Sequence, residues 1–224
     1  MLTLHHLEYS QSFRILWLLE ELGVEYDLKK YNRNKANKLA PADYKAISPL
    51  GSAPVIEHDG QVLAESGAIM DYILDLYPSD TLRPEKGAPN RARYLFWMHA
   101  SNGSMMPLML LDTLFTLMRQ RSPFFMKPAI VPMLKLVQSQ FVGPRMEALL
   151  TLAEENLSEM AWFGGDELTA ADIAMCYPME GASVRGYFDE GRPNCQAWLR
   201  RMYAHPSFKR AKEIDGREQM VLPL

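Results

Sequence analysis

Glu65 and Ser66 place an acid and a hydroxyl where an apolar helix pattern begins, in the stretch QVLAESGAIMDYI. The first turn of a helix has unpaired backbone N–H groups and the positive end of the helix dipole, so it binds anions. A carboxylate beside it adds a partner for a cation. The pair can therefore hold a ligand that carries both charges, although simple capping of the helix would use the same residue types.

Tyr9, Ser10 and Ser12 offer three hydroxyl groups in a turn between a strand-like run and a second helix pattern. A hydroxyl at a helix N-terminus can stabilise a nearby anion. Ser12 also stands where the N-cap of that helix is expected, which is a structural role.

Histidine and cysteine residues form no metal-binding pattern. His5 and His6 are neighbours in a strand-like run, so their side chains point to opposite faces, and no further ligand set accompanies them. His99 lies in a helix pattern, where packing or surface roles are more common. Cys176 and Cys195 form neither a CxxC pair nor a cluster. We expect no metal site.

The elements that position these residues alternate between strands and helices. TLHHL from Thr3 reads as a strand, and SFRILWLLEELG follows with apolar residues at helical spacing and Gly23 at the stop position. VEYDLKK from Val24 alternates as a half-buried strand does, and PADYKAI from Pro41 predicts a short helix.

A hairpin and a third helix complete this part. The runs PVIEH and QVLA flank Asp59-Gly60, a pair that favours a two-residue turn with both residues at positive φ. Ser66 is expected to cap a helix that ends before Pro78. The first 77 residues therefore predict the order βαβαββα.

Strand signals stop after a connector rich in proline and charge, Tyr77 to Asn90. The rest predicts five to seven helices. We expect the fold class α/β plus all-α, with an amino-terminal domain at residues 1–80, a linker at 81–90 and an all-helical domain at 91–224.

Composition excludes several functions. The chain has 224 residues, 48% of them hydrophobic, and a formal net charge of −3 with its Lys and Arg residues dispersed. It is long enough for a sizeable core, and we expect neither nucleic acid nor a membrane as a partner. No leader pattern, CxxC pair or apolar run of spanning length is present, which favours the cytoplasm.

Four segments in this order resemble the cytosolic glutathione transferases, in particular serine-type members like those of bacteria and fungi. They are YSQSFRILWLLEELG, SPLGSAPVIEHDG, the ES of LAESGAIMDYI, and GDELTAADIA. The resemblance spans essentially the whole chain. It implies a thioredoxin-like βαβαββα domain joined to an all-helical domain.

The resemblance also implies how glutathione binds. Pro54 is expected to follow a cis peptide bond, and Val55 to offer its backbone to the cysteinyl part. Glu65 and Ser66 are expected to hold the ammonium and carboxylate of the glutamyl end. Lys38 is expected over the glycyl carboxylate, with Asn37 and Ser52 as alternatives for the same contact and a solvated surface lysine as the structural alternative.

Ser10 lies four residues before Arg14, the position of the catalytic serine in serine-type members. Because the thiolate is the nucleophile, Ser10 is expected to stabilise it, with Tyr9 as the rival and Ser12 as a cap. No cysteine occurs between Met1 and Met175, which disfavours disulfide exchange but not glutathione-dependent peroxide reduction.

In the second domain the resemblance implies a pocket for hydrophobic electrophiles. Tyr9, Asn102, Met105 and Met106 are its candidate walls, since thioethers adapt to varied shapes. Ordinary core packing is the more common role of such methionines. Thr169 and Asp172 fit a capping box, a structural role.

The function these features indicate is conjugation of the glutathione thiolate to hydrophobic electrophiles in detoxification, with peroxide reduction as a further activity. Glutathione is then a cosubstrate, no tightly bound cofactor is required, and a homodimer is implied. A non-catalytic binding or scaffold protein, and a specialised isomerase or dehalogenase of the same fold, remain alternatives.

Overall fold

Four strands form one mixed sheet in the computed structural model, which describes residues 1–48, 50–188 and 190–221. The strands are β1 (Thr3–Leu7), β2 (Asp27–Tyr31), β3 (Val55–His58) and β4 (Gln61–Ala64), in the order β2-β1-β3-β4. β1 runs parallel to β2 and antiparallel to β3, and β3 and β4 form an antiparallel hairpin. With helices α1 (Ser12–Leu22), α2 (Ala42–Ile47) and α3 (Ser66–Leu76), this confirms the predicted βαβαββα order.

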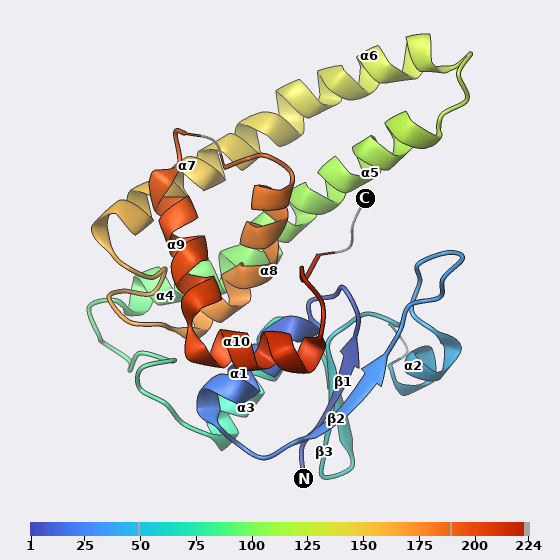
Figure 1. Ribbon diagram of the computed structural model, residues 1–224. Coiled ribbons are helices and arrows are strands. Elements are labelled where there is room, and N and C mark those ends of the chain that lie inside the picture. Colours follow the sequence, from blue (N-terminus) through green and yellow to red (C-terminus); the bar gives the residue numbers. More distant parts are fainter. Residues whose placement is uncertain (49, 189, 222–224) are drawn as a thin grey trace.

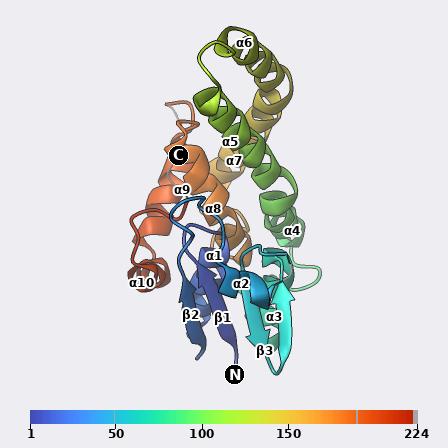
Figure 2. The same ribbon diagram turned by 90° about the vertical axis from the view of Figure 1, so that its right-hand side faces the viewer.

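Helices cover both faces of the sheet. α1 and α3 lie together on one side of it, and α2 lies on the other (Figures 1 and 2). β1 is central and buried along its whole length, because both its faces are covered and both its edges are paired.

Backbone turns follow the sequence signals closely. Asp59 and Gly60 have φ of 48° and 78°, the positive values that a tight hairpin of this type needs. Gly23 ends α1 with φ 65°, a conformation that costs a glycine little. Both predictions are confirmed.

The two predicted serine N-caps are wrong by one residue. Gln11 occupies the N-cap position of α1 and Glu65 that of α3, so Ser12 and Ser66 are the first helical residues, and neither helix has a side-chain cap bond. The two hydroxyls are therefore available for other contacts.

Seven α-helices and two π-helical turns follow among the described residues, at the upper end of the predicted number. They are α4 (Arg91–Ala100), η1 (Ser101–Met105), α5 (Met106–Arg121), α6 (Lys127–Val137), η2 (Gln138–Val142), α7 (Gly143–Glu159), α8 (Ala170–Val184), α9 (Pro193–Ala204) and α10 (Pro206–Asp215). α4, η1 and α5 form one long rod that pairs with a second rod of α6, η2 and α7 (Figure 1).

α8 is buried along most of its length and begins at the predicted capping box. The Thr169 and Asp172 side chains each satisfy a backbone donor at the start of the helix. Asp172 also accepts hydrogen bonds from the Phe163 N–H at 2.7 Å and the Trp198 indole at 2.9 Å. Its role is structural, as the sequence predicted.

The sheet part and the helical part share one hydrophobic core. Trp17 of α1 packs edge to face on Phe208 of α10, with ring centroids 5.0 Å apart, and its indole N–H donates to Ser207 Oγ at 2.8 Å. α1 contacts α8 as well as α10. The turn before α1 is thus anchored to both parts of the chain.

The connector between α3 and α4 is partly packed rather than free. Leu82 is buried, and its carbonyl accepts the Ala170 N–H at 2.9 Å. Asn90 donates to the Gly164 carbonyl at 2.9 Å.

None of the helices among the described residues is both long and apolar enough to cross a bilayer.

Candidate functional site

The strand register brings the predicted site segments to one end of the sheet. Val55, the first residue of β3, pairs with His5 on one side and with Ala64, the last residue of β4, on the other. Leu7, the last residue of β1, pairs with Tyr31, the last residue of β2. The segments that contain Ser10, Lys38, Pro54 and Glu65 therefore all leave or enter the sheet at this end.

The peptide bond between Ala53 and Pro54 is cis, as the resemblance implied. Val55 is fully buried and has a strand partner on both sides, so its backbone does not lie at a free edge. Ser52 and Ala53, on the other side of the bond, are exposed and half-buried. The accessible residues here are thus Ser52 and Ala53 rather than Val55, which corrects the expectation for Val55. The Ser52 carbonyl accepts a hydrogen bond from the Tyr44 hydroxyl at 3.3 Å.

Glu65 has a strained backbone whose cost helix capping does not explain. Its φ is 75°, in the left-handed region that disfavours a residue with a side chain. Its side chain is exposed and makes no cap bond to α3. Ser66 beside it is buried and begins the helix. The acid and the helix start thus lie side by side, without the mutual capping that was the alternative explanation.

Ser10 lies in a network of hydrogen bonds at the start of α1. Its Oγ donates to the Leu7 carbonyl at 2.7 Å, accepts the Ser12 N–H at 3.2 Å, and lies 2.7 Å from Ser12 Oγ. The Ser12 hydroxyl in turn lies 2.9 Å from His6 Nδ1. Ser12 is therefore a partner of Ser10 rather than a helix cap.

His6 extends this network to the far end of the chain. Its Nε2 lies 2.8 Å from Oδ1 of Asp215, the last residue of α10, and Arg217 donates to the same oxygen at 2.6 Å. Burial alone would raise the pKa of Asp215, but the hydrogen bond and charge of His6, with Arg217, more than offset it and hold this pKa below its ordinary value. His6 and Asp215 are both buried. A buried chain of polar groups thus joins Ser10 to Asp215.

Arg14 is a further residue of this region that sequence reasoning used only as a landmark. It is completely buried, and its Nη1 donates to Gln11 Oε1 and to Asn102 Oδ1, both at 2.6 Å. Its Nε and Nη2 have no hydrogen-bond partner among the described residues. Burial lowers the pKa of the guanidinium to about 10. Arg14 thereby ties the turn that holds Ser10 to the π-helical turn η1.

Tyr9 is held mainly through its backbone. Its φ is 49°, and its carbonyl accepts hydrogen bonds from Arg33 Nη2 at 3.2 Å and from the Tyr177 hydroxyl at 3.3 Å. The guanidinium of Arg217 lies 5.4 Å from the centroid of its ring. Its phenol makes no hydrogen bond within the described part of the chain.

Lys38 and Ser52, the candidates for the glycyl carboxylate, are both exposed. Lys38 lies in a turn and has a φ of 61°. Its backbone carbonyl accepts a hydrogen bond from Arg33 Nη1 at 3.0 Å. Asn37, the alternative, uses its side-chain oxygen to accept the Leu39 N–H at 2.9 Å.

The residues expected to line the electrophile pocket differ in their burial. Asn102 is half-buried and bound to Arg14, and Met106 is half-buried. Met105 is fully buried within the core cluster, so it cannot line an open pocket. The expectation for Met105 is wrong because a local concentration of methionines does not reveal which of them faces the core.

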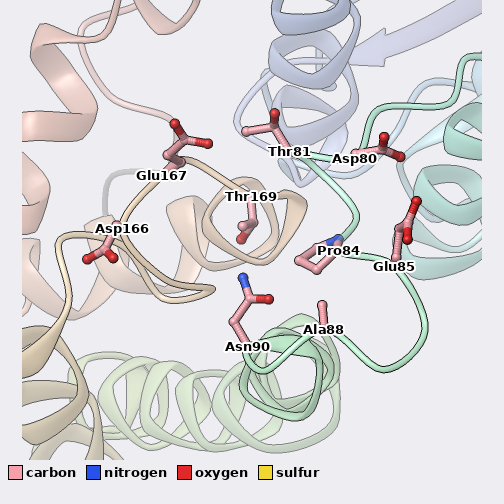
Figure 3. A pocket seen from close by; sticks show the side chains of 9 residues that line it. All are labelled: Asp80, Thr81, Pro84, Glu85, Ala88, Asn90, Asp166, Glu167 and Thr169. Carbon is pink, nitrogen blue, oxygen red and sulfur yellow. The ribbon is translucent and has the colours of Figure 1, made fainter.

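A cavity of about 540 Å³ lies elsewhere, between the connector and the start of α8 (Figure 3). The carboxylates of Asp80, Glu85, Asp166 and Glu167 stand around it, with Pro84, Asn90 and Thr169 between them. It contains none of the candidate site residues, and its neighbours Asn90 and Thr169 have structural hydrogen bonds. We assign it to the junction of the two parts.

No cluster of three or more His, Cys, Asp or Glu side chains suited to a metal ion occurs in the part of the chain that the structure describes. Burial raises the pKa of the Cys176 thiol to about 12, so this thiol is not an ionised nucleophile near neutral pH.

Comparison with known families gives two matches. Residues 1–75 match the model of the glutathione S-transferase N-terminal domain, and residues 124–206 match the model of the glutathione S-transferase C-terminal domain.

Relatives with assigned names match over nearly the whole chain. Glutathione S-transferase 3 of Schizosaccharomyces pombe is 32% identical over 213 residues, which cover 95% of this chain and 87% of that protein. Glutathione S-transferase 1 of Saccharomyces cerevisiae is 26% identical and covers 95% of this chain and 94% of its own. The crystal structure of a glutathione S-transferase from Actinobacillus pleuropneumoniae superposes with a TM-score of 0.78 at 29% identity, covering 96% of this chain and 93% of that one.

Proposed function

The chain belongs to the cytosolic glutathione S-transferase family, and on that premise we propose that it binds reduced glutathione beside Ser10 and transfers the thiolate to hydrophobic electrophiles. The family uses glutathione as a cosubstrate. The finer assignment to conjugation depends on the residues at the end of the sheet.

The observation that carries the proposal is the backbone of Glu65. Its left-handed φ of 75° costs free energy and gives no capping bond in return. That cost is accounted for if the conformation holds the carboxylate against the ammonium of the glutamyl group. Ser66 and the free N–H groups of α3 then bind the glutamyl carboxylate.

The cysteinyl part of glutathione lies along the main chain of Ser52 and Ala53 in this proposal, because Val55 has no free edge. Lys38 reaches the glycyl carboxylate from its exposed turn. This orientation directs the sulfur toward the start of α1.

The Ser10 hydroxyl donates the hydrogen bond that stabilises the sulfur anion and keeps its own proton. Its Oγ–H turns from the Leu7 carbonyl to the thiolate, while the Ser12 N–H still donates to Ser10 Oγ and the Ser12 hydroxyl stays within hydrogen-bond distance of it. The thiol of bound glutathione loses its proton to solvent. The thiolate attacks the electrophilic carbon, a C–S bond forms, and the leaving group departs with its electron pair. Peroxide reduction would use the same thiolate, which attacks the peroxide oxygen and releases the alcohol, and a second glutathione then converts the oxidised sulfur to glutathione disulfide with release of water.

In this proposal the electrophile binds near Ser10, against Asn102, Met106 and Tyr9. Arg14 fixes Asn102 relative to the turn that holds Ser10, so the two sides of the pocket keep their spacing. We further propose a homodimer that works in the cytoplasm.

Retention on immobilised glutathione, followed by turnover with a general aryl halide, tests the proposal. We expect wild type to bind and turn over, and Ser10→Ala to bind with turnover reduced about 10- to 100-fold. If wild type binds glutathione without turnover, and Ser10→Ala behaves in the same way, the result would instead support a non-catalytic binding protein.

A further inference from the structure

The turn between α5 and α6 lies at the end of the molecule far from the sheet (Figures 1 and 2). Three adjacent apolar side chains are exposed there. The exposed fraction is 85% for Phe124, 69% for Phe125 and 44% for Met126. The two phenyl rings contact each other edge to face at 5.8 Å, and neither belongs to the core cluster. We call residues 119–127 the hairpin tip.

The hairpin tip has a defined backbone rather than a frayed one. The Ser122 N–H donates to the Met118 carbonyl at 3.1 Å, and the Met126 N–H donates to the Pro123 carbonyl at 2.9 Å. Proline at the start of α6 restricts the chain further. The phenyl groups are thus held outward, and their exposure is a property of the fold.

Helix α6 continues the same unusual surface. Only Leu134 is buried in this apolar helix, while Met133 and Leu136 are 56% and 55% exposed. Exposed apolar surface of this extent normally marks a contact with another molecule or a membrane.

The charged residues in and around the hairpin tip are all cations. Five of the 24 Lys and Arg residues and none of the 27 Asp and Glu residues lie between Thr113 and Met146. The five cations are Arg119, Arg121, Lys127, Lys135 and Arg145, and none of them forms an ion pair among the residues that the structure describes. Three of the five lie within the hairpin tip itself.

We propose that the hairpin tip docks on the surface of an anionic phospholipid bilayer. Phe124 and Phe125 enter the boundary between head groups and acyl chains, and Arg119, Arg121 and Lys127 bind the anionic head groups around them. The protein contacts the surface of the bilayer and does not span it.

A bilayer fits this surface better than a folded protein partner does. The apolar groups project from a convex turn, and a bilayer can receive such a projection without a matching cavity. The whole chain carries a net charge of −3, which would oppose an anionic surface if charge were evenly spread. The expectation of no membrane partner rested on Lys and Arg residues that are dispersed along the chain. The segment between Thr113 and Met146 departs from that pattern, because all its charged residues are cations.

Co-sedimentation with vesicles tests the proposal on the full chain. The vesicles are phosphatidylcholine alone and phosphatidylcholine with phosphatidylserine, at low and raised salt. One variant, Phe124→Ser with Phe125→Ser, removes the apolar anchor; a second, Arg119→Gln with Arg121→Gln and Lys127→Gln, removes the local charge. The matched controls are Val184→Ser, at a residue 56% exposed on α8, and Lys86→Gln with Arg200→Gln and Lys209→Gln at exposed cations elsewhere.

We expect wild type and both controls to sediment with the anionic vesicles and to be released by salt. Because each cation near an anionic leaflet contributes about fivefold to binding, both hairpin variants should bind at least tenfold more weakly. All variants should keep a melting temperature close to that of wild type, since the altered side chains are exposed except for Arg119, which is half-buried and donates one hydrogen bond to Thr116 Oγ1. The proposal would be overturned if wild type does not sediment with anionic vesicles, or if the two variants of the hairpin tip bind as strongly as the controls. A hairpin variant that changes only the sedimentation coefficient of the free protein would do the same, and would assign the tip to contact between copies of this chain.

Discussion

At the scale of single residues, the proposed chemistry depends on the Ser10 hydroxyl. Ser10→Ala should raise the pKa of the bound glutathione thiol by roughly one to two units, equivalent to about 1.4 to 2.7 kcal/mol, while glutathione affinity changes little. The measurement is the thiolate absorbance of bound glutathione as a function of pH. Tyr9→Phe is the control and should leave the titration unchanged. A shift in Tyr9→Phe with none in Ser10→Ala would move the assignment to the phenol.

The strained backbone of Glu65 gives a second prediction in which stability and binding change in opposite directions. Glu65→Gly should raise the free energy of unfolding by about 1 kcal/mol, because glycine adopts a φ of 75° without steric cost. The same change should weaken glutathione binding at least about tenfold, since it removes the charge partner of the ammonium. Urea unfolding and calorimetry measure the two effects. Glu65→Gln keeps the strain and removes the charge, so it should weaken binding without the gain in stability.

Asp215 gives a pH-dependent prediction. Its pKa is lowered in the folded protein, so its contribution to stability is present above the ordinary carboxyl pKa and is lost as pH falls through the lowered value. Asp215→Asn should therefore destabilise the fold at neutral pH, by about 3 kcal/mol for a broken buried pair, and the difference from wild type should shrink below about pH 4. Urea unfolding at a series of pH values measures it, with the exposed Asp80→Asn as control. A difference that stays constant down to low pH would mean that the carboxylate charge is not the cause.

The sequence predicted the types of the site residues better than their contacts. Glu65, Ser66 and Ser10 could be proposed because each stands at a turn or helix start that local patterns locate. The bond between His6 and Asp215 could not, since 209 residues separate its partners and only the packing of α10 on α1 brings them together. Val55 and Met105 were misjudged for a related reason, because strand pairing and burial depend on the whole fold.

At the scale of elements, the capping box of α8 is a structural device. Thr169→Ala removes a side chain that satisfies a backbone donor at the helix start, so the free energy of unfolding should fall by about 1 kcal/mol while turnover per folded molecule stays the same. Thermal melting and steady-state kinetics on the same samples test this. Unchanged melting with lost turnover would show that Thr169 acts in the chemistry.

Elements were predictable where short-range rules fix the backbone. The Asp59-Gly60 hairpin followed from the requirement for positive φ at both positions, and the structure has it. The cap of α1 was misplaced because contacts outside the helix compete for the Ser12 hydroxyl. Ser12 Oγ accepts the Leu7 N–H at 3.2 Å, which ties it to β1 instead of to its own helix.

At the scale of the whole molecule, the core shared by the two parts predicts a single cooperative unfolding transition. Phe208 of α10 packs on Trp17 and Phe13 of α1, with ring centroids 5.0 and 5.3 Å away. Phe208→Ala should therefore lower stability by about 3 to 5 kcal/mol and shift the unfolding of both parts together. Phe124→Ala, at an exposed side chain, is the matched control and should have little effect. Calorimetric scans with two transitions, of which only one moves, would disprove the single unit.

Binding of reduced glutathione, measured by titration calorimetry, tests the central claim most directly. Wild type should bind one tripeptide per chain at millimolar or lower concentration, and Ser66→Ala and Glu65→Gln should each bind it more weakly by about tenfold, equivalent to about 1.4 kcal/mol. Folded wild type that takes up no glutathione, or a Glu65→Gln variant that binds as wild type does, would contradict the account.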